Sequence, residues 1–294
     1  MLLQEAVDEF LTDCRAGGLA PKTLDVYAMN LRLFCGSTGE IDLANLQVSH
    51  ARHFLADLQE RDLSPYTVDQ YYRTLNTFFR WCVREGVLGA NPIVQVRRPR
   101  LPKHIVHRLR SEQVMRLIEV VNETALHDRN LAIVLLMVDS GLRVGEVVGI
   151  RRGDLNLQDS YVQVNGKGNK DRQVPLGEIT KQALVRYLQV RRESDSRYVF
   201  LNKTGSAMTV MAVQLVLRRL ADKVGVERLH PHLLRHTFAK LYMEEGDVKT
   251  LQMILGHASA ETTTAIYLDP DIEDLKRQHR RAGPVDRLYA GKAF

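Results

Sequence analysis

Several basic residues in the C-terminal half of the sequence have the types and spacing needed to bind a phosphate group. Arg143 follows Gly141 and Leu142 at the predicted start of a helix, and the glycine can end the helix before it. The helix dipole disfavours a cation at a helix N-terminus, so an arginine there indicates that an anion binds nearby. The alternative is that Arg143 pairs with Glu146, one turn further on.

A second basic group opens another predicted helix, in the sequence HPHLLRH at residues 230–236. His232, Arg235 and His236 are expected together on the face of this helix opposite its apolar stripe. There they could bind a phosphate or, through the histidines, a metal ion. A further histidine, His257, directly follows a glycine. The apolar stripe is defined by helical spacing and consists of Leu234, Phe238, Leu241 and Tyr242.

The elements that must position these groups are mainly α-helices. One stretch differs, because residues 161–164 alternate like a strand, 165–169 have the composition of a turn, and 172–176 return. This pattern predicts a β-hairpin with lysines at its tip. Hydrophobic periodicity predicts helices near residues 2–16, 22–36, 48–61, 65–85, 111–122, 128–139, 143–150, 177–192, 209–223, 231–245, 247–255 and 271–281.

Two of the N-terminal helices begin alike, with LAPKT at 19–23 and LSPYT at 63–67, and the similarity continues along both at a spacing of 44 residues. Proline suits a first helical turn because its missing N–H would have no partner there. The similarity fits an internal repeat, or equally two similar amphipathic helices in one bundle. The aromatic residues of these helices recur at core-facing spacing, and nothing in this region looks catalytic.

Charge is divided unevenly along the chain. Residues 1–96 contain 8 Lys and Arg against 12 Asp and Glu, whereas the rest contains 33 against 23, so the two parts carry −4 and +10. Residues 97–110 hold six basic residues, no acid and two prolines, which disfavour a helix. Such a segment could lie along phosphate oxygens, or it could be a linker kept soluble by its charge.

The overall composition excludes several classes of protein. The 294 residues suffice for two domains, and 45% hydrophobic with 26% charged residues is typical of a soluble globular chain. Residues 131–138 form the longest apolar run, too short for a membrane span, and the N-terminus lacks a signal-peptide pattern, so a cytoplasmic protein is expected. Three cysteines without CxxC spacing argue against a disulfide framework and a thiolate zinc site. P-loop, HExxH and GxSxG motifs are missing.

Taken in order, the motifs resemble those of the tyrosine recombinases, the phage integrase and Xer family. The resemblance rests on GLRVGE at 141–146, NGKGNKDRQVPL at 165–176, HLLRH at 232–236, LGH at 255–257 and a TT…Y pattern ending at Tyr267. Each motif is short, but five in the family's order with compatible spacing are highly specific. The four N-terminal helices and the basic segment also resemble that family's core-binding region.

The resemblance implies a mainly α fold with a small antiparallel β-sheet, in two domains. Residues 1–96 would form a helical, SAM-like core-binding domain that contacts DNA. A basic linker would follow at 97–105, and the catalytic domain would occupy 106–294. The predicted DNA contacts in the linker and the hairpin are Arg97, Arg98, Arg100, Lys103, Lys170 and Arg172.

Six residues acquire catalytic roles from the resemblance. Arg143 and Arg235 would clamp the scissile phosphate, and Lys167 would act as general acid toward the leaving oxygen. His232 and His257 would hydrogen-bond the phosphate and assist proton transfer. Tyr267 would be the nucleophile; a phenol titrates near pH ~10 and therefore needs a cationic setting to lose its proton at neutral pH.

The implied activity is site-specific recombination through a 3′-phosphotyrosyl intermediate, with strand exchange between two sites. Because the ester stores the bond energy, neither ATP nor a metal or other cofactor is expected. The expected partners are double-stranded DNA with inverted half-sites and three further copies of the chain, which form a homo-tetramer on DNA. An accessory directionality factor is a further candidate partner, a membrane is not, and the protein would associate with the nucleoid when on DNA.

Two features depart from the family pattern. Ten positions separate His257 from Tyr267, one more than in the Xer type, and this spacing leans toward a mobile-element integrase. Leu268 and Asp269 follow the tyrosine in place of the threonine or alanine plus histidine often found there. The segment 271–294 is a candidate for docking onto a neighbouring copy, or for folding onto its own domain.

Other classes of protein are weaker interpretations of the same residues. A metal-dependent nuclease would use His230, His232, His236 and His257, but no acidic residue has ligand-like spacing to them. A catalytically silent DNA-binding regulator would keep the fold without turnover, yet all six catalytic positions hold competent residues. A type IB topoisomerase would form the same covalent adduct and differ by lacking strand exchange between two sites.

Overall fold

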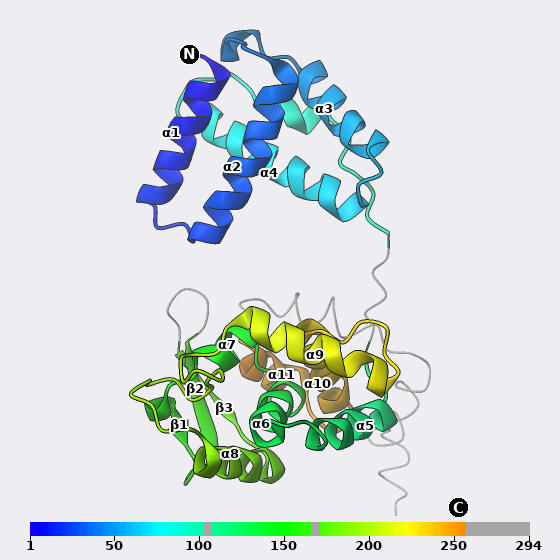
Figure 1. The fold of residues 1–294 in the computed structure, drawn as a ribbon. Coiled ribbons are helices and arrows are strands. Elements are labelled where there is room, and N and C mark those ends of the chain that lie inside the picture. The colour runs from blue at the N-terminus through cyan, green and yellow to red at the C-terminus, as the bar shows by residue number, and fades with distance from the viewer. Residues whose placement is uncertain (103–107, 166–170, 257–294) are drawn as a thin grey trace, which may run out of the picture. The chain divides into compact units, whose positions relative to one another are not determined.

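The computed structural model describes residues 1–102, 108–165 and 171–256. The chain divides into two compact units, Met1–Ile105 and Val106–Phe294, and each has its own hydrophobic core (Figure 1). Helices dominate the described residues and are joined by a three-stranded antiparallel sheet, which confirms the predicted fold class. Over these same ranges, no helix has the length and apolar character to cross a membrane.

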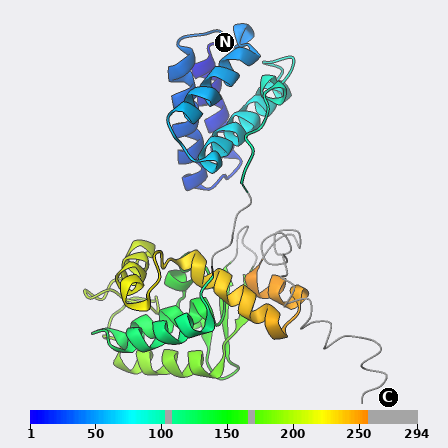
Figure 2. The ribbon, with the colours of Figure 1, turned by 90° about the vertical axis from the view of Figure 1, so that its right-hand side faces the viewer.

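The first unit is a bundle of four α-helices, and Figures 1 and 2 show it from two sides. All four were predicted from periodicity, and each boundary agrees within two residues. Their inner faces meet in an aromatic core that includes Phe10, Phe34, Phe78 and Phe79, all fully buried. The helices are α1 (Leu3–Ala16), α2 (Pro21–Thr38), α3 (Val48–Glu60) and α4 (Pro65–Arg84), with short 3₁₀ helices η1 (Leu43–Asn45) and η2 (Pro92–Gln95).

Helices α2 and α4 begin in the same way, as their sequences predict. Pro21 and Pro65 are the first helical residues, and the N-cap Ser64 accepts a hydrogen bond at its Oγ from the backbone N of Thr67 at 3.2 Å. The two helices also touch at equivalent positions, because Asn30 Nδ2 donates to Thr74 Oγ1 at 2.9 Å in the buried interface. The spacing of that pair, 44 residues, is the same as that of the sequence similarity.

The basic segment after the bundle lies, as far as Pro102, along one face of α4. Tyr66 Oη donates to the carbonyl oxygen of Pro102 at 2.8 Å. Further along the helix, the buried Asp69 accepts from Arg98 at 2.6 and 3.1 Å, and Arg73 contacts the same carboxylate at 2.9 Å. Arg98 therefore fastens the segment to α4, and its hydrogen bond, ahead of the two arginine charges, lowers the pKa of Asp69. Arg97 and Arg100 are exposed, and Lys103 lies outside the described residues.

The second unit is built around α6 (His127–Val138), which is buried from Asn130 to Val138. This helix packs against neighbours from every part of the unit: α5 (Ser111–Asn122), α7 (Val144–Gly149), α8 (Glu178–Val190) and α10 (Pro231–Glu245). The other helices are η3 (Arg152–Asp154), α9 (Val210–Val224) and α11 (Val248–Leu255). The α-helices of this unit confirm the periodic pattern to within two residues at each end, whereas η3 was not predicted. The helix predicted at 271–281 lies outside the described residues.

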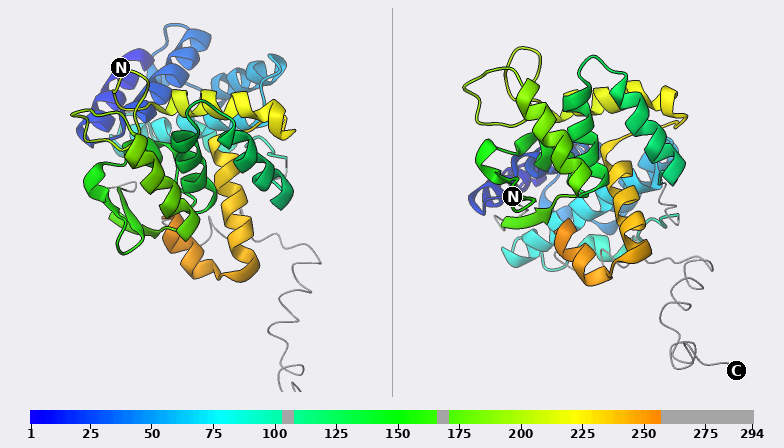
Figure 3. Two further views of the ribbon diagram at one scale, coloured as in Figure 1. Left: turned by 60° about the horizontal axis from the view of Figure 1, so that its bottom comes forward. Right: turned by 90° about the horizontal axis from the view of Figure 1, so that it is seen from below.

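The predicted hairpin is present as β2 (Tyr161–Asn165) and β3 (Asp171–Pro175), paired in antiparallel register with Val162 opposite Val174. Its tip, with Lys167 and Lys170, lies outside the described residues. A short strand, β1 (Leu155–Asn156), pairs with β2 and was missed, because two residues are too few to show alternation. Figure 3 shows α11 at the end of α10, beside β3.

The connection from α6 to α7 places Arg143 at the start of α7. Gly141 has φ +62°, a left-handed conformation that turns the chain between the two helices. Just before this turn, Asp139 accepts hydrogen bonds from Gly177 N at 3.0 Å and Thr180 Oγ1 at 2.6 Å, so it caps α8 from a different helix. The turn is thus held from two sides, because Asp139 accepts from residues at the start of α8 and the carbonyl oxygen of Gly141 accepts from Arg235 in α10.

Replacing Gly141 with alanine should destabilise the second unit. A Cβ at this position would overlap the ring of Phe238 in α10, and the backbone is in a region unfavourable to L-residues with side chains. We expect the free energy of unfolding, measured with urea, to fall by about 2–4 kcal/mol. Gly145→Ala is the matched control, because a Cβ there meets no described atom within 4 Å, and helix propensity predicts a gain of up to about 1 kcal/mol. Equal stabilities of the two variants would contradict this account.

Candidate active site

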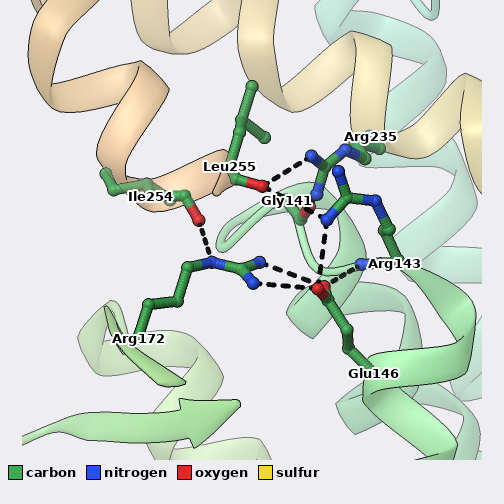
Figure 4. Close-up of polar contacts among 7 residues, drawn as sticks. All are labelled: Gly141, Arg143, Glu146, Arg172, Arg235, Ile254 and Leu255. Atoms are coloured by element: carbon green, nitrogen blue, oxygen red, sulfur yellow. Dashed lines mark hydrogen bonds and ion pairs between the residues drawn. The ribbon is translucent and has the colours of Figure 1, made fainter. Parts of the chain in front are cut away.

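Arg143 and Arg235 come from different helices and meet at one carbonyl oxygen (Figure 4). Arg143 is the N-cap of α7, and Arg235 lies in the second turn of α10. Arg143 Nη1 donates to the oxygen of Leu255 at 3.3 Å, and Arg235 Nη2 donates to the same oxygen at 2.8 Å. Because one oxygen accepts from both side chains, both guanidinium groups lie within reach of a single small anion.

The prediction that Arg235 projects from a face of α10 opposite the core is wrong. Its side chain is buried, with 4% of the residue exposed, because α10 is packed on nearly all sides. Its guanidinium is accommodated by main-chain oxygens, donating to Gly141 at 2.6 Å as well as to Leu255. His232 is exposed and His236 half-buried, with their ring centroids 6.5 Å apart.

Glu146 is the carboxylate of the site, and its spacing in the sequence predicts only that it pairs with Arg143. Its side chain accepts from Arg143 N at 2.8 Å and from Arg143 Nη1 at 3.1 Å, so the predicted alternative, an ion pair one turn apart, is present. The pair does not occupy Arg143 fully, since 39% of the arginine side chain remains exposed and it also reaches Leu255. The ion pair with Glu146 is thus confirmed, and anion binding by Arg143 stays a prediction.

Arg172, predicted as a DNA contact, lies inside this cluster. Its Nη1 and Nη2 donate to the two carboxylate oxygens of Glu146 at 2.9 and 3.1 Å, and its Nε donates to the oxygen of Ile254 at 2.7 Å. Burial alone would raise the pKa of Glu146. The hydrogen bonds and charge of Arg172, followed by those of Arg143, outweigh burial and lower it, so Glu146 is ionised at neutral pH.

The histidines at the start of α10 have different surroundings. His230 is the N-cap, and its Nδ1 accepts from Leu233 N at 3.2 Å, so that ring atom is used in capping the start of the helix. The pKa of His232 is lowered, first by loss of hydration and then by the positive charges of Arg235 and Arg143. His232 is therefore neutral at pH 7 and lies close enough to both arginines to sense their charge.

The described residues bring together three of the six predicted catalytic residues, Arg143, His232 and Arg235. Lys167, His257 and Tyr267 lie outside the described ranges, although Gly256, the residue before His257, ends α11 in a left-handed conformation. The sequence did not predict that main-chain oxygens at the end of α11 accept hydrogen bonds from the arginines of the site. The Arg-x-x-Glu spacing of residues 143 and 146 was the available signal for Glu146, since it matches a capping box at the start of a helix.

Comparisons with known proteins agree with this architecture. Residues 107–273 match the phage integrase family, and residues 7–87 match the phage integrase N-terminal SAM-like domain. A tyrosine recombinase XerC from Alcanivorax borkumensis is 34% identical, covering 95% of this chain and 94% of its own. The crystal structure of a XerA recombinase is 25% identical with a TM-score of 0.56, covering 95% and 99% of the two chains. A XerH recombinase bound to a palindromic difH substrate, 22% identical, has the same fold with a TM-score of 0.73, covering 95% and 84%.

The chain belongs to the phage integrase family. Its activity is that of a XerC-like tyrosine recombinase, a site-specific enzyme that binds, cleaves and rejoins DNA. The spacing between His257 and Tyr267, one position longer than in the Xer type, favours the prediction of a mobile-element integrase. That finer assignment stays a prediction, and the similarity to XerC proteins does not support it.

The lowered pKa of His232 predicts a particular loss of stability in acid. The unfolded chain takes up this proton near pH 6.5, at a higher pH than the folded protein, so acidification below about pH 6.5 favours unfolding. Between about pH 7.5 and about pH 5.5, the urea midpoint should therefore fall further in the unaltered protein than in His232→Asn. His230 is present in both proteins, and its pKa is lowered first by burial and then by the charge of His232; losing that second contribution in His232→Asn changes the comparison in the same direction. Identical pH dependence in the two would contradict the shift.

Proposed function

We propose that the chain recombines two DNA sites through a 3′-phosphotyrosyl intermediate formed by Tyr267, with Arg143 and Arg235 holding the scissile phosphate. The observation that carries the proposal is the shared acceptor, Leu255 O, which both guanidinium groups reach at 3.3 and 2.8 Å. A phosphate has several oxygens, so it offers the same two donors more acceptors than the carbonyl does. Arginine suits this role because its planar fork matches two phosphate oxygens.

The arginines act where charge grows during the reaction. When a phenolate attacks phosphorus, negative charge develops on the non-bridging oxygens, and fixed donors aimed there stabilise the transition state more than the ground state. Arg235 is buried and held by two carbonyl oxygens, so it needs little reorganisation to act. Two such cations can supply the electrostatic stabilisation that metal ions supply in other nucleases.

The remaining groups handle protons and leaving groups. His232 is neutral before DNA binds, so it can donate one hydrogen bond to a phosphate oxygen without adding to the repulsion between the cations. His257 takes a similar role, and Lys167 protonates the leaving 5′ oxygen. The phosphotyrosyl ester conserves the energy of the broken bond, so religation to a second strand needs neither ATP nor a cofactor.

The assembly proposed is a homo-tetramer on two duplexes, each with inverted half-sites, because each exchanged strand requires its own nucleophile. The palindromic substrate of the solved XerH complex supports inverted half-sites. Arg97, Arg98, Arg100, Lys103 and Lys170 are the proposed phosphate contacts outside the active site, with Arg98 shared between DNA and Asp69. The protein would act on DNA in the cytoplasm, and an accessory factor would set the direction of exchange.

The nucleophile is tested by Tyr267→Phe, which removes only the phenolic oxygen. A duplex is first selected from a randomised library by binding to the unaltered protein, and is then nicked near the cleavage point to trap the intermediate. In EDTA, the unaltered protein should form a covalent adduct resistant to denaturing gels, and Tyr267→Phe should bind the duplex equally and form none. Tyr242→Phe, beside Phe238 in the core, is the matched control and should keep the adduct.

Two results would contradict this proposal. An adduct retained by Tyr267→Phe would remove Tyr267 as nucleophile, and adduct formation that disappears with EDTA would favour a metal-dependent reaction. A second assay with two marked duplexes then separates recombination from topoisomerase activity, since only a recombinase exchanges strands between them.

The division of labour between the arginines and Lys167 predicts a selective rescue. A bridging 5′-phosphorothiolate leaves without needing a proton, because a thiolate is a far better leaving group than an alkoxide. Lys167→Ala should therefore lose cleavage on the ordinary substrate and recover it on the sulfur-containing one. Arg143→Ala and Arg235→Ala should remain impaired on both, by about 100-fold or more. Lys170→Ala is the control within the hairpin tip; if it is rescued and Lys167→Ala is not, the general acid is Lys170.

A further inference from the structure

Arg172 directs its guanidinium into the protein, toward one carboxylate and one main-chain oxygen. All three of its nitrogens donate, two to Glu146 and one to Ile254, and only 13% of the side chain is exposed (Figure 4). A phosphate contact would be limited to the second hydrogens of Nη1 and Nη2, on a side chain whose three nitrogens already donate inward. These contacts favour a role inside the active site over a contact with DNA.

The bidentate pair with Glu146 determines how strongly that carboxylate attracts Arg143. Arg143 and Arg172 share Glu146, so the trio keeps one net positive charge, which Arg143 can offer to a phosphate. Without Arg172, the nearly buried carboxylate would have Arg143 as its remaining partner among these three residues. An uncompensated buried charge is costly, so Glu146 would either draw the Arg143 guanidinium toward itself or take up a proton.

The third contact of Arg172 reaches the turn that precedes His257 in the sequence. Its Nε binds Ile254 O, and its side chain lies directly beneath Gly256, where an added Cβ would come within 3.0 Å of Arg172 Cδ, Nε and Cζ. Leu255, between these two residues, is the acceptor shared by Arg143 and Arg235. Arg172 therefore holds, from β3, the main-chain turn on which both phosphate-binding arginines rest.

We propose that Arg172 is a positioning residue for the cleavage step: it neutralises Glu146 and fixes the end of α11, so that the Arg143 guanidinium remains available to the scissile phosphate. The proposal rests on the function proposed above. It replaces the DNA contact predicted for Arg172 from the sequence. Its physical content is a coupling between Arg172 and Glu146 in the rate of cleavage, with no part in DNA affinity.

The test uses the nicked duplex selected by binding and compares Arg172→Lys, Arg172→Gln and the unaltered protein. At saturating protein, single-turnover adduct formation should slow by about 10-fold for Lys, which keeps the charge without the fork, and about 100-fold for Gln. The dissociation constant and its salt dependence should stay unchanged. Arg186→Gln, at an exposed position of α8, is the matched control and should cleave at the original rate.

A double-substitution cycle separates positioning through Glu146 from a general loss of structure. In a Glu146→Gln background no carboxylate needs neutralising, and only the bond from Arg172 to Ile254 O is left to lose, so adding Arg172→Gln should slow cleavage by about 10-fold in place of about 100-fold. If Arg172→Gln slows cleavage by the same factor in this background as it does in the protein that retains Glu146, the proposal is overturned. A salt slope lowered by about 0.9 with an unchanged saturated rate, which is the signature of a lost phosphate contact, would overturn it as well.

A folding defect, a failure of the proposed function and a failure of the positioning role give different results. Urea unfolding of each variant identifies a folding defect, and Arg172→Lys, the milder change, decides the matter if Arg172→Gln does not fold; an unchanged cleavage rate in Arg172→Lys overturns the proposal. If the unaltered protein forms no adduct, the proposed function itself fails. If it forms the adduct and the Arg172 variants cleave normally, only the positioning role fails.

Discussion

The proposed active site depends on the balance between three arginine side chains and one carboxylate. Positive charge gathered around a phosphate site would repel itself in the free protein unless something held it in place. Glu146 and the oxygens of Gly141, Ile254 and Leu255 provide that restraint. The carboxylate neutralises one charge only, and the carbonyl oxygens accept hydrogen bonds without cancelling any. Donors are thereby fixed in position while the site stays cationic, which is the condition for binding a phosphate and stabilising the charge that develops on it.

This restraint links elements that are distant in sequence. Arg143 caps α7, Arg172 comes from β3, Arg235 from α10, and all three bond to the end of α11 or to the carboxylate of α7. Gly141 contributes twice, since its left-handed turn delivers Arg143 and its oxygen accepts from Arg235. A small displacement of the α11 turn would therefore move several donors together, and His257 and Tyr267 follow that turn in the chain.

The first unit also contains a carboxylate that is shared by two arginines. Asp69 is a buried carboxylate that binds Arg73 on its own helix and Arg98 on the basic segment. The pair fixes where the segment runs along α4, and Arg97 and Arg100 remain exposed beside it. The first 96 residues carry a net charge of −4, and Arg97 and Arg100 are among the residues proposed above to contact DNA.

Hydrophobic periodicity and motif order predicted the helices, the hairpin, the fold class and the family, because both can be read from short stretches of the chain. Pro21 and Pro65 mark the starts of helices through their own backbone preference, and the structure has the boundaries there. Gly141 lies in the turn after α6, which ends earlier, at Val138. Arg143 and Arg235 could also be predicted as phosphate-binding residues from the sequence, because each lies in a short motif. Tertiary structure alone decided that Arg235 is buried, that Arg172 faces Glu146, and that Arg98 faces Asp69. The partners that satisfy these charges are 20 to 94 residues away and are often main-chain oxygens, which every residue possesses and no sequence pattern distinguishes.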